Sequence, residues 1–431
     1  MRLRTFALVG CVGALALGTA ACGDDSDSGG STGSSGAGTS TSSSSGGGGG
    51  GTVDLYSSLP LQGASKDQTN AMVKGIQLAV DEAGGKAGDY TVNYQSLDDS
   101  TAQAGNWTPE QESANARRAA QDDATAVFLG PFNSGAAAVS IPILNEGGVP
   151  QISPANTAVG LTTDEPGSNP GEPDKYYPTG TRNYTRIVPK DTIQAAALVT
   201  VMKEDGCTKA QLANDKEVYG AGLAKNIELA AQSQGLELVS NEGIDKNAAN
   251  YRSLAQKAKA AGADCFVYAG ITANNAVQLY KDFAAALPGA GLYGPDGVAE
   301  SGFVDPKEGG IPADVQSRVK VSVATLNPDS YPPDGQEFFK AYSEKYGEKQ
   351  PDPYAIYGYE AMRLALDAIE RSKTGEKADI IKALFSTKDR ESVLGTYSID
   401  ENGDTTLTDY GIYSVKDGNL EFDKTVKAQV G

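Results

Sequence analysis

Short apolar runs and amphipathic stretches alternate along the chain from residue 52 onward. An apolar run of about four to eight residues between turn-forming residues is typical of a buried strand, whereas apolar positions three and four apart indicate a helix. In the first part of the chain this pattern predicts strands at 53–57, 91–97, 125–129 and 149–153, and helices at 68–83, 109–122 and 136–146.

A segment rich in Pro, Gly and Tyr at 164–182 interrupts the alternation, which resumes after a connector at 186–189. Repeated strand–helix–strand units form parallel sheets covered by helices on both faces, so we expect two doubly wound α/β lobes. The second run predicts strands at 210–213, 236–240, 265–269, 291–293 and 319–324, and helices at 220–234, 251–261 and 273–287.

Residues 1–21 have the pattern of a secretion signal. Arg2 and Arg4 precede an apolar run at 6–17, and the small residues at 18–21 lead directly to Cys22. The run is shorter than the roughly 20 residues that a membrane-spanning helix needs. Small residues before a cysteine favour a lipoprotein signal, with an ordinary signal cut nearby as the alternative. Either form predicts an extracytoplasmic protein, and the first predicts a lipid on Cys22 that anchors it to the cell membrane.

Residues 22–51 are predicted to be a tether. From 23 to 51 the chain is Ser, Thr or Gly except at 24, 25, 27 and 37, so this stretch has no apolar residues with which to form a core. As a random coil it would span roughly 30 Å, which would keep a folded domain close to the membrane.

Charge and composition exclude several classes of protein. The chain has 36 basic and 55 acidic residues, and a net charge of −19 disfavours nucleic-acid binding. It contains no histidine, which excludes the usual Ser-His-Asp and Cys-His hydrolases and His-ligated zinc sites. We therefore expect no metal and no cofactor. Residues 52–431 are enough for two lobes of ordinary size.

Cys207 and Cys265 are the two cysteines that remain beyond the signal and Cys22. In an oxidising compartment such a pair usually forms a disulfide, and two unpaired buried thiols are the alternative. Each precedes a short apolar run, so adjacent parallel strands would bring the two together.

Several segments resemble the type I periplasmic binding proteins for branched-chain amino acids and related amides, which feed ABC importers. The resemblance covers Thr52 to about Gly418, and the order and spacing of the segments carry it. They are Ser57–Gly63, Lys74–Ala79, Gly130–Gly135 and Val149–Thr157 in the first lobe, and Asn214–Gly220 and Gly294–Gly297 in the second.

The resemblance implies two lobes joined by a hinge of three chain segments, near Val188, Ala324 and Tyr397. The first lobe would then comprise 52–189 and 327–394, and the second 190–325 and 395–431. Ligands of open α/β sheets bind beyond the carboxyl ends of the strands, where the similar loops are predicted to lie.

Asn133, Ser134 and Gly135 are expected to open a helix. Their backbone N–H groups and the Ser134 hydroxyl can hold an anion such as a ligand carboxylate, and a simple helix cap at Ser134 is the alternative or an accompaniment.

The resemblance assigns further ligand contacts. Ala155 would offer its carbonyl and Thr157 its hydroxyl or N–H, with Asn156 between them, while Tyr219 and Asp296 would close from the other lobe. Asp296 stands where the family often has Glu, and a turn residue in Gly-Pro-Asp-Gly is the alternative. Ile271 replaces a common aromatic residue, which leaves the preference for a solute side chain open.

Four residues are weaker candidates. Ser58 is placed either to help hold the carboxylate or to cap a helix. Trp107, the single tryptophan, either faces the cleft or packs in the lobe. Tyr354 and Tyr357 lie near the start of a helix that should return to the first lobe. They either line the rim of the cleft or belong to the core, and the core is the safer interpretation.

The sequence thus predicts a monomeric solute-binding protein that captures a branched-chain or other amino acid for an ABC transporter permease. Amide or urea binding and ligand sensing by the same fold are alternatives. An amidase that uses Ser134 is disfavoured because no base is predicted beside it.

Overall fold

The structure, a computed structural model, describes residues 50–428. The predicted signal at 1–21, the lipid site at Cys22 and nearly all of the tether lie outside these residues. None of the helices described is both long and apolar enough to cross a membrane.

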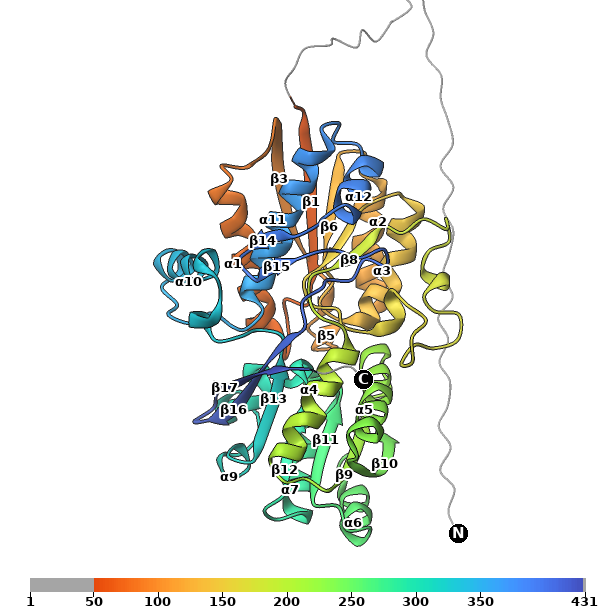
Figure 1. Ribbon diagram of the computed structural model, residues 1–431, viewed down its shortest axis with the longest axis vertical. Helices are drawn as coiled ribbons and strands as arrows, with labels where there is room; N and C mark the ends of the chain where they lie inside the picture. Colours follow the sequence, from red (N-terminus) through yellow and green to blue (C-terminus); the bar gives the residue numbers. More distant parts are fainter. Residues whose placement is uncertain (1–49, 429–431) are drawn as a thin grey trace, which may run out of the picture. The chain divides into compact units, whose positions relative to one another are not determined.

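The first sheet has the strand order β2-β3-β1-β6-β7-β8, and all neighbours except β2 and β3 are parallel (Figure 1). Its strands are β1 (Thr52–Leu59), β2 (Lys86–Ala87), β3 (Tyr90–Asp98), β6 (Thr125–Leu129), β7 (Gln151–Ser153) and β8 (Tyr184–Arg186). The helices of this lobe are α1 (Lys66–Glu82), α2 (Pro109–Gln121), α3 (Ser134–Glu146), α11 (Ala355–Ser372) and α12 (Lys377–Phe385).

Successive residues of β1 point to opposite faces of the sheet, which explains the two helix layers. Leu55 belongs to the large core cluster that includes Met72 of α1 and Ile369 of α11. Tyr56 instead packs with Ala116 of α2 and others beneath α3. Because side chains alternate along a strand, each face carries its own helix pair, α1 with α11 and α2 with α3.

The second sheet has the strand order β10-β9-β11-β12-β13-β16-β17. Its first five strands are parallel to one another, β16 is antiparallel to β13, and β17 is antiparallel to β16. Its strands are β9 (Lys209–Asn214), β10 (Glu237–Gly243), β11 (Cys265–Ala269), β12 (Gly291–Gly294), β13 (Val319–Val323), β16 (Asp409–Lys416) and β17 (Asn419–Lys427). The helices are α4 (Asp191–Glu204), α5 (Val218–Gln234), α6 (Arg252–Ala260), α7 (Ala276–Ala286), α8 (Ser301–Val304) and α9 (Ala313–Gln316).

Both sheets have the doubly wound order, in which the first parallel strand lies between the next two parallel strands of the chain: β1 between β3 and β6, and β9 between β10 and β11. The predicted fold class is confirmed. In such sheets the strand order reverses beside the first strand, and this point forms a crevice at the carboxyl ends. Here the crevice lies beside β1 in one lobe and β9 in the other.

The chain passes between the two sheets after β8, after β13 and after β15 within residues 50–428. The second passage leads to α10 (Pro333–Tyr346), and the third follows the hairpin of β14 (Arg390–Ser392) and β15 (Gly395–Tyr397). A further hairpin joins β4 (Ser100–Thr101) to β5 (Asn106–Trp107). The lobe boundaries given above remain a prediction.

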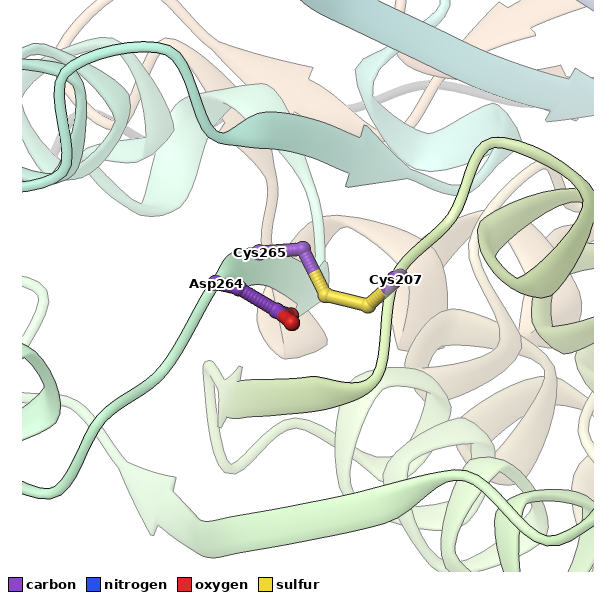
Figure 2. A group of neighbouring side chains, drawn as sticks. All are labelled: Cys207, Asp264 and Cys265. Atoms are coloured by element: carbon purple, nitrogen blue, oxygen red, sulfur yellow. A yellow bond between two sulfur atoms is a disulfide. The ribbon is translucent and has the colours of Figure 1, made fainter.

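Cys207 and Cys265 meet as the strand pairing requires. Cys265 begins β11 and pairs with Ala210 of the parallel strand β9, which follows Cys207. The Cα atoms of the two cysteines are 5.9 Å apart, and Figure 2 shows their sulfur atoms joined. Asp264 lies beside them, but its carboxylate accepts backbone N–H bonds from Thr208 and Lys209, and joined sulfurs are not metal ligands.

Candidate ligand-binding cleft

A cavity of about 20 Å³ lies where loops beyond the carboxyl ends of both sheets meet. It has room for about one water-sized group. Seven of the residues predicted to bind ligand line it, together with Phe132 and Gly297. The seven are Asn133, Ser134, Ala155 and Thr157 from the first lobe and Tyr219, Ile271 and Asp296 from the second.

The start of α3 forms the first-lobe wall. Asn133 is the N-cap residue, but its side chain makes no capping hydrogen bond, and the first turn contains no acidic residue. Backbone N–H groups in the first turn of a helix have no acceptor within the helix. Ser134 Oγ accepts the Ala158 N–H at 3.3 Å, so its own proton is available to a ligand. This end of α3 therefore offers donors and a positive helix dipole to an anion.

Two side chains hold the neighbouring loop in place. Ser153 Oγ accepts the N–H groups of Ala155 and Asn156, at 3.2 and 2.9 Å. Asn156 Nδ2 donates to the carbonyls of Pro131 and Phe132, at 3.0 and 2.8 Å. Asn156 is fully buried and outside the cavity lining, so it ties the two ligand loops together rather than facing the cavity.

Asp296 is the central acidic group of the second-lobe wall. Its Oδ1 accepts hydrogen bonds from Tyr219 Oη and Gln194 Nε2, both at 2.6 Å. Its Oδ2 accepts from Tyr354 Oη, also at 2.6 Å. Tyr354 directly precedes α11, so this bond links the two lobes.

Burial and the charge of Asp296 raise the pKa of both Tyr219 and Tyr354 well above the usual value. Both hydroxyls therefore keep their protons and donate them to Asp296. A carboxylate can accept about four hydrogen bonds, so one position remains for a donor on a ligand.

Ser58 lies beneath the cleft instead of in its wall. It is fully buried; its Oγ donates to Glu112 Oε2 at 2.5 Å and accepts from Asn115 Nδ2 at 3.0 Å. Burial raises the pKa of Glu112 to about 8, and burial together with Glu112 raises that of Asp99 well above its usual range. Ser58 is thus part of a buried carboxyl cluster.

Trp107 packs against the start of α3. A Cβ atom on Gly135 would lie 2.6 Å from the Trp107 ring, which is closer than real Cβ atoms come. Glycine at 135 therefore lets the indole cover the first turn of the helix from outside the cavity lining.

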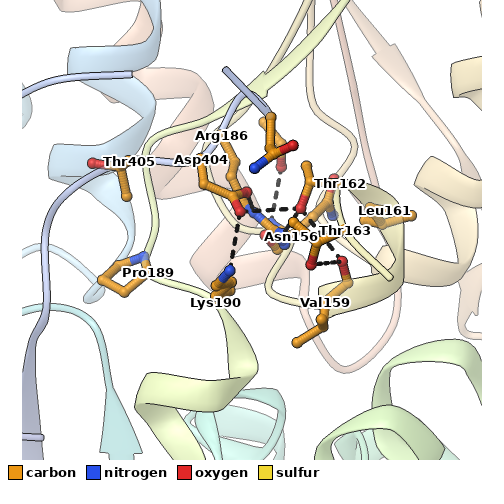
Figure 3. Close-up of polar contacts among 12 residues, drawn as sticks. Asn156, Val159, Leu161, Thr162, Thr163, Arg186, Pro189, Lys190, Asp404 and Thr405 are labelled. Atoms are coloured by element: carbon orange, nitrogen blue, oxygen red, sulfur yellow. Dashed lines mark hydrogen bonds and ion pairs between the residues drawn. The ribbon is translucent and has the colours of Figure 1, made fainter. Parts of the chain in front are cut away.

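A buried ion-pair network holds the site loop from behind (Figure 3). Arg186 Nε donates to Asp404 Oδ1 at 2.7 Å, and Lys190 Nζ lies 3.4 Å from Asp404 Oδ2. Arg186 Nη1 also donates to the carbonyls of Asn156 and Ala158, at 3.1 and 2.8 Å. Burial alone would raise the pKa of Asp404, but Arg186 and Lys190 lower it, so the carboxylate is charged.

Sequence reasoning did not place Phe132, Gly297 or Gln194 in the site, and it gave Tyr354 only as a weak candidate. Phe132 lies inside the similar segment at 130–135, and Gly297 follows Asp296, so both could have been found there. A Cβ on Gly297 would lie 2.6 Å from the Gly270 carbonyl, so this position has no room for a side chain. Gln194 carried no local signal.

The comparison with known families decides what this architecture is. The family described as periplasmic binding protein matches residues 57–419. The chain belongs to this family. Its members bind small molecules outside the cytoplasm and work with ABC transporter permeases, so this chain is a solute-binding protein.

Individual relatives of this periplasmic binding protein are distant. The Leu/Ile/Val-binding protein BraC3 of Rhizobium johnstonii is 26% identical over 371 residues, which cover 84% of this chain and 91% of that protein. The leucine-binding protein LivK of Thermotoga maritima has a TM-score of 0.74 at 21% identity and covers 87% of this chain and 99% of its own.

A second similar structure has a different ligand. A solute-binding protein of Rhodopseudomonas palustris in complex with p-hydroxybenzoic acid has a TM-score of 0.70 at 20% identity and covers 88% of this chain and 98% of its own. The fold is therefore shared by proteins that bind amino acids and by proteins that bind aromatic acids.

Proposed function

We propose that the protein captures an amino acid, branched-chain or other, and delivers it to the permease of an ABC importer. The observation that carries this proposal is the polarity of the cavity. The uncapped, positive end of α3 forms one wall, and the buried carboxylate of Asp296 forms the opposite wall. A zwitterion carries both matching charges.

The carboxylate of the solute would accept hydrogen bonds from the first-turn N–H groups of α3 and from the hydroxyl of Ser134. Its ammonium would donate to Asp296, to the Ala155 carbonyl and to the Thr157 hydroxyl. Burying an unpaired charge costs several kcal/mol, so both ends of the solute need these partners.

Asp296 separates this proposal from an aromatic-acid ligand. The start of α3 can hold any carboxylate, benzoates included, but a benzoate has no cationic group for Asp296, and 4-hydroxybenzoate offers it only a neutral phenol hydroxyl. Urea and short amides do carry N–H donors for this carboxylate, so they remain the alternative class of solute.

Hydrogen bonds between the two lobes beside the cavity support the proposal that a closed form of the protein delivers the solute. Gln68 Nε2 donates to the Ala299 carbonyl at 3.2 Å, and Ser301 Oγ donates to Asp67 Oδ2 at 2.6 Å. Together with the bond from Tyr354 to Asp296, they connect α1 and α11 to the second lobe. A bound amino acid would hold the lobes further apart than they are here, because the present cavity has room for about one water-sized group. A permease or a sensor receptor can recognise the arrangement of the lobes that the solute stabilises.

Binding without catalysis is part of the proposal. Ser134 is the candidate nucleophile of the cavity lining. Within the part of the chain described, that lining contains no basic side chain that could activate its hydroxyl. We further propose a monomer, anchored through Cys22, with a disulfide between Cys207 and Cys265. Membrane partitioning of Cys22→Ser and mass spectrometry of the non-reduced protein test the last two points.

A thermal-shift screen tests the function directly. The panel would contain leucine, isoleucine, valine, alanine, glycine, urea, acetamide and 4-hydroxybenzoate. A solute at 100 times its Kd adds about 2.7 kcal/mol to the free energy of unfolding. We expect an amino acid to give this shift and Asp296→Asn to abolish it. A shift with 4-hydroxybenzoate alone, retained in Asp296→Asn, would reject the proposal.

A further inference from the structure

Asp191, the first residue of α4, is a buried carboxyl that the site as described leaves without a role. Its side chain is 0% exposed, and neither oxygen has a hydrogen-bond partner among residues 50–428. Its backbone N–H donates to the Thr157 carbonyl at 2.8 Å. Asp191 is therefore fixed directly behind a residue of the cavity wall.

The second lobe encloses Asp191 from the other side. A Cβ on Gly222 of α5 would lie 4.0 Å from Asp191 Oδ2, and Gly222 is one turn after Tyr219 of the cavity lining. The negative charge of Asp191 contributes to the raised pKa of Tyr219, so it acts across the cavity wall.

The groups that face Asp191 leave its charge without a matched cation. Arg186 of β8 is committed to Asp404, and Lys190, beside Asp191 in sequence, lies within ion-pair distance of Glu165 and Asp404. Tyr410 of β16, also within electrostatic reach, donates its proton to the Pro189 carbonyl.

Asp296 is the other carboxylate within electrostatic reach. Burial raises the pKa of Asp191 to about 7; the charge of Asp296 adds to the rise, and the charge of Arg186 opposes it in part. Near neutral pH the Asp191 carboxyl is therefore protonated in a large fraction of molecules.

We propose that Asp191 is a second counter-charge for the ammonium group of the solute and that it ionises when the solute binds. The O–H bond of the carboxylic acid breaks, its proton goes to the solvent, and the carboxylate remains to balance the ammonium through Thr157. This inference rests on the proposed function, because only a cationic group in the cavity supplies the driving force.

The size of the effect follows from electrostatics. An ammonium roughly 6 to 8 Å from a buried carboxyl lowers the pKa of that carboxyl by about one to two units at an effective dielectric constant of about 20. Because binding then releases a proton, the affinity should rise with pH, by up to about tenfold between pH 6 and 8. Asp191 would thereby favour solutes with an ammonium over neutral amides and benzoates.

Titration calorimetry in two buffers with different ionisation enthalpies measures the released proton. The probes are leucine, alanine, the diamine putrescine, acetamide and 4-hydroxybenzoate, added to the full folded protein at pH 6.5. We expect any ammonium-bearing probe that binds to release about 0.5 to 0.8 proton from the wild type and almost none from Asp191→Asn. Asp191→Asn should also lose the pH dependence of the affinity between pH 6 and 8.

Glu300→Gln is the matched control. Glu300 is another buried second-lobe carboxyl with an unpartnered oxygen and a pKa that burial raises to about 7, but it lies near Ser65 rather than Thr157. This variant should keep more than half of the proton release. If both variants lost the proton release equally, or if Asp191→Asn still released the proton, this inference would be overturned while the proposed function would stand. If no ammonium-bearing probe binds, the inference falls together with the proposed function.

Discussion

At the residue scale, the cleft depends on a few carboxyl groups whose partners come from distant parts of the chain. Asp296 is 102 residues from Gln194 and 58 from Tyr354 along the chain. No local sequence pattern encodes such pairs, which explains why Asp296 was placed in the site while its donor Gln194 was missed and its donor Tyr354 was only a weak candidate. Asn133, Ser134, Ala155 and Thr157 were accessible to prediction because each lies in a contiguous loop after a strand.

The three donors of Asp296 decide how its role should be tested. Asp296→Ala would leave the Tyr354 hydroxyl without its acceptor and the Tyr219 hydroxyl with only Gln194 Oε1 at 3.5 Å, whereas Gln194 Nε2 would keep Ser322 Oγ at 3.1 Å. An unsatisfied buried group costs about 1 to 3 kcal/mol, so a loss of stability would accompany the loss of binding. Asp296→Asn keeps the volume and one acceptor but removes the charge. We expect it to weaken binding of the amino acid found in the screen by roughly 2 to 5 kcal/mol, or about 30-fold to several thousand-fold.

Tyr354→Phe is the control for this experiment, because it removes one donor and leaves the charge of Asp296 in place. Calorimetry should show a much smaller loss for this variant. If Asp296→Asn and Tyr354→Phe weakened binding equally, the effect would come from the lost contact between the lobes and not from the lost charge of Asp296.

Asp191 predicts a pH dependence of stability even without solute. Its pKa rises from 3.8 unfolded to about 7 folded, so its favourable contribution is fully present below pH 3.8 and is lost as the pH rises through 7. About three pKa units at about 1.4 kcal/mol each correspond to about 4 kcal/mol. Urea unfolding of Asp191→Asn should therefore show a gain of up to that amount at pH 8 compared with pH 4. If the free energy of unfolding changed with pH in the same way in the variant and the wild type, this prediction would be wrong.

At the element scale, the strands that are apolar throughout were the easiest to predict. The strands predicted at 125–129 and 265–269 are β6 and β11 residue for residue, because every residue in both is buried and apolarity alone marks them. α4 was missed because it is buried on nearly every side and has no polar face to reveal a helical period. β17 was missed because charged residues are interspersed through it, whereas β16 was missed although its charges lie only at its two ends, Asp409 and Lys416.

The start of α3 depends on the contact between Gly135 and Trp107. Gly135→Ala would force the indole away from the helix, and overpacking of this kind destabilises by about 1 to 3 kcal/mol. Because the chain has a single tryptophan, its fluorescence spectrum should shift in this variant. Gly222→Ala is a matched helical control, since its nearest neighbour would be 3.5 Å away. An unchanged spectrum in Gly135→Ala would contradict the packing.

At the scale of the whole molecule, the ion pair of Arg186 and Asp404 joins a strand of the first sheet to the passage that leads into β16. Both side chains are nearly or fully buried. Breaking a buried pair by removing one partner costs about 3 to 5 kcal/mol, because the other charge stays behind.

We expect Asp404→Ala to lower the free energy of unfolding by that amount and also to weaken solute binding, because Arg186 holds the Asn156 and Ala158 carbonyls. Urea unfolding and calorimetry measure the two effects. Lys416→Ala, which removes a surface pair with Glu421, should change neither. If Asp404→Ala lowered the free energy of unfolding by less than about 1 kcal/mol, the ion-pair network of Arg186 and Asp404 would not support the site.

The bond between Tyr354 and Asp296 has a consequence for the time a solute spends on the protein. A captured molecule can leave only after the lobes separate at this point, so this bond helps to set the residence time. Slow spontaneous release would keep the solute from diffusing away between encounters with the membrane complex. Handover would then depend on a partner that pulls the lobes apart and supplies, at that moment, the energy to open this bond.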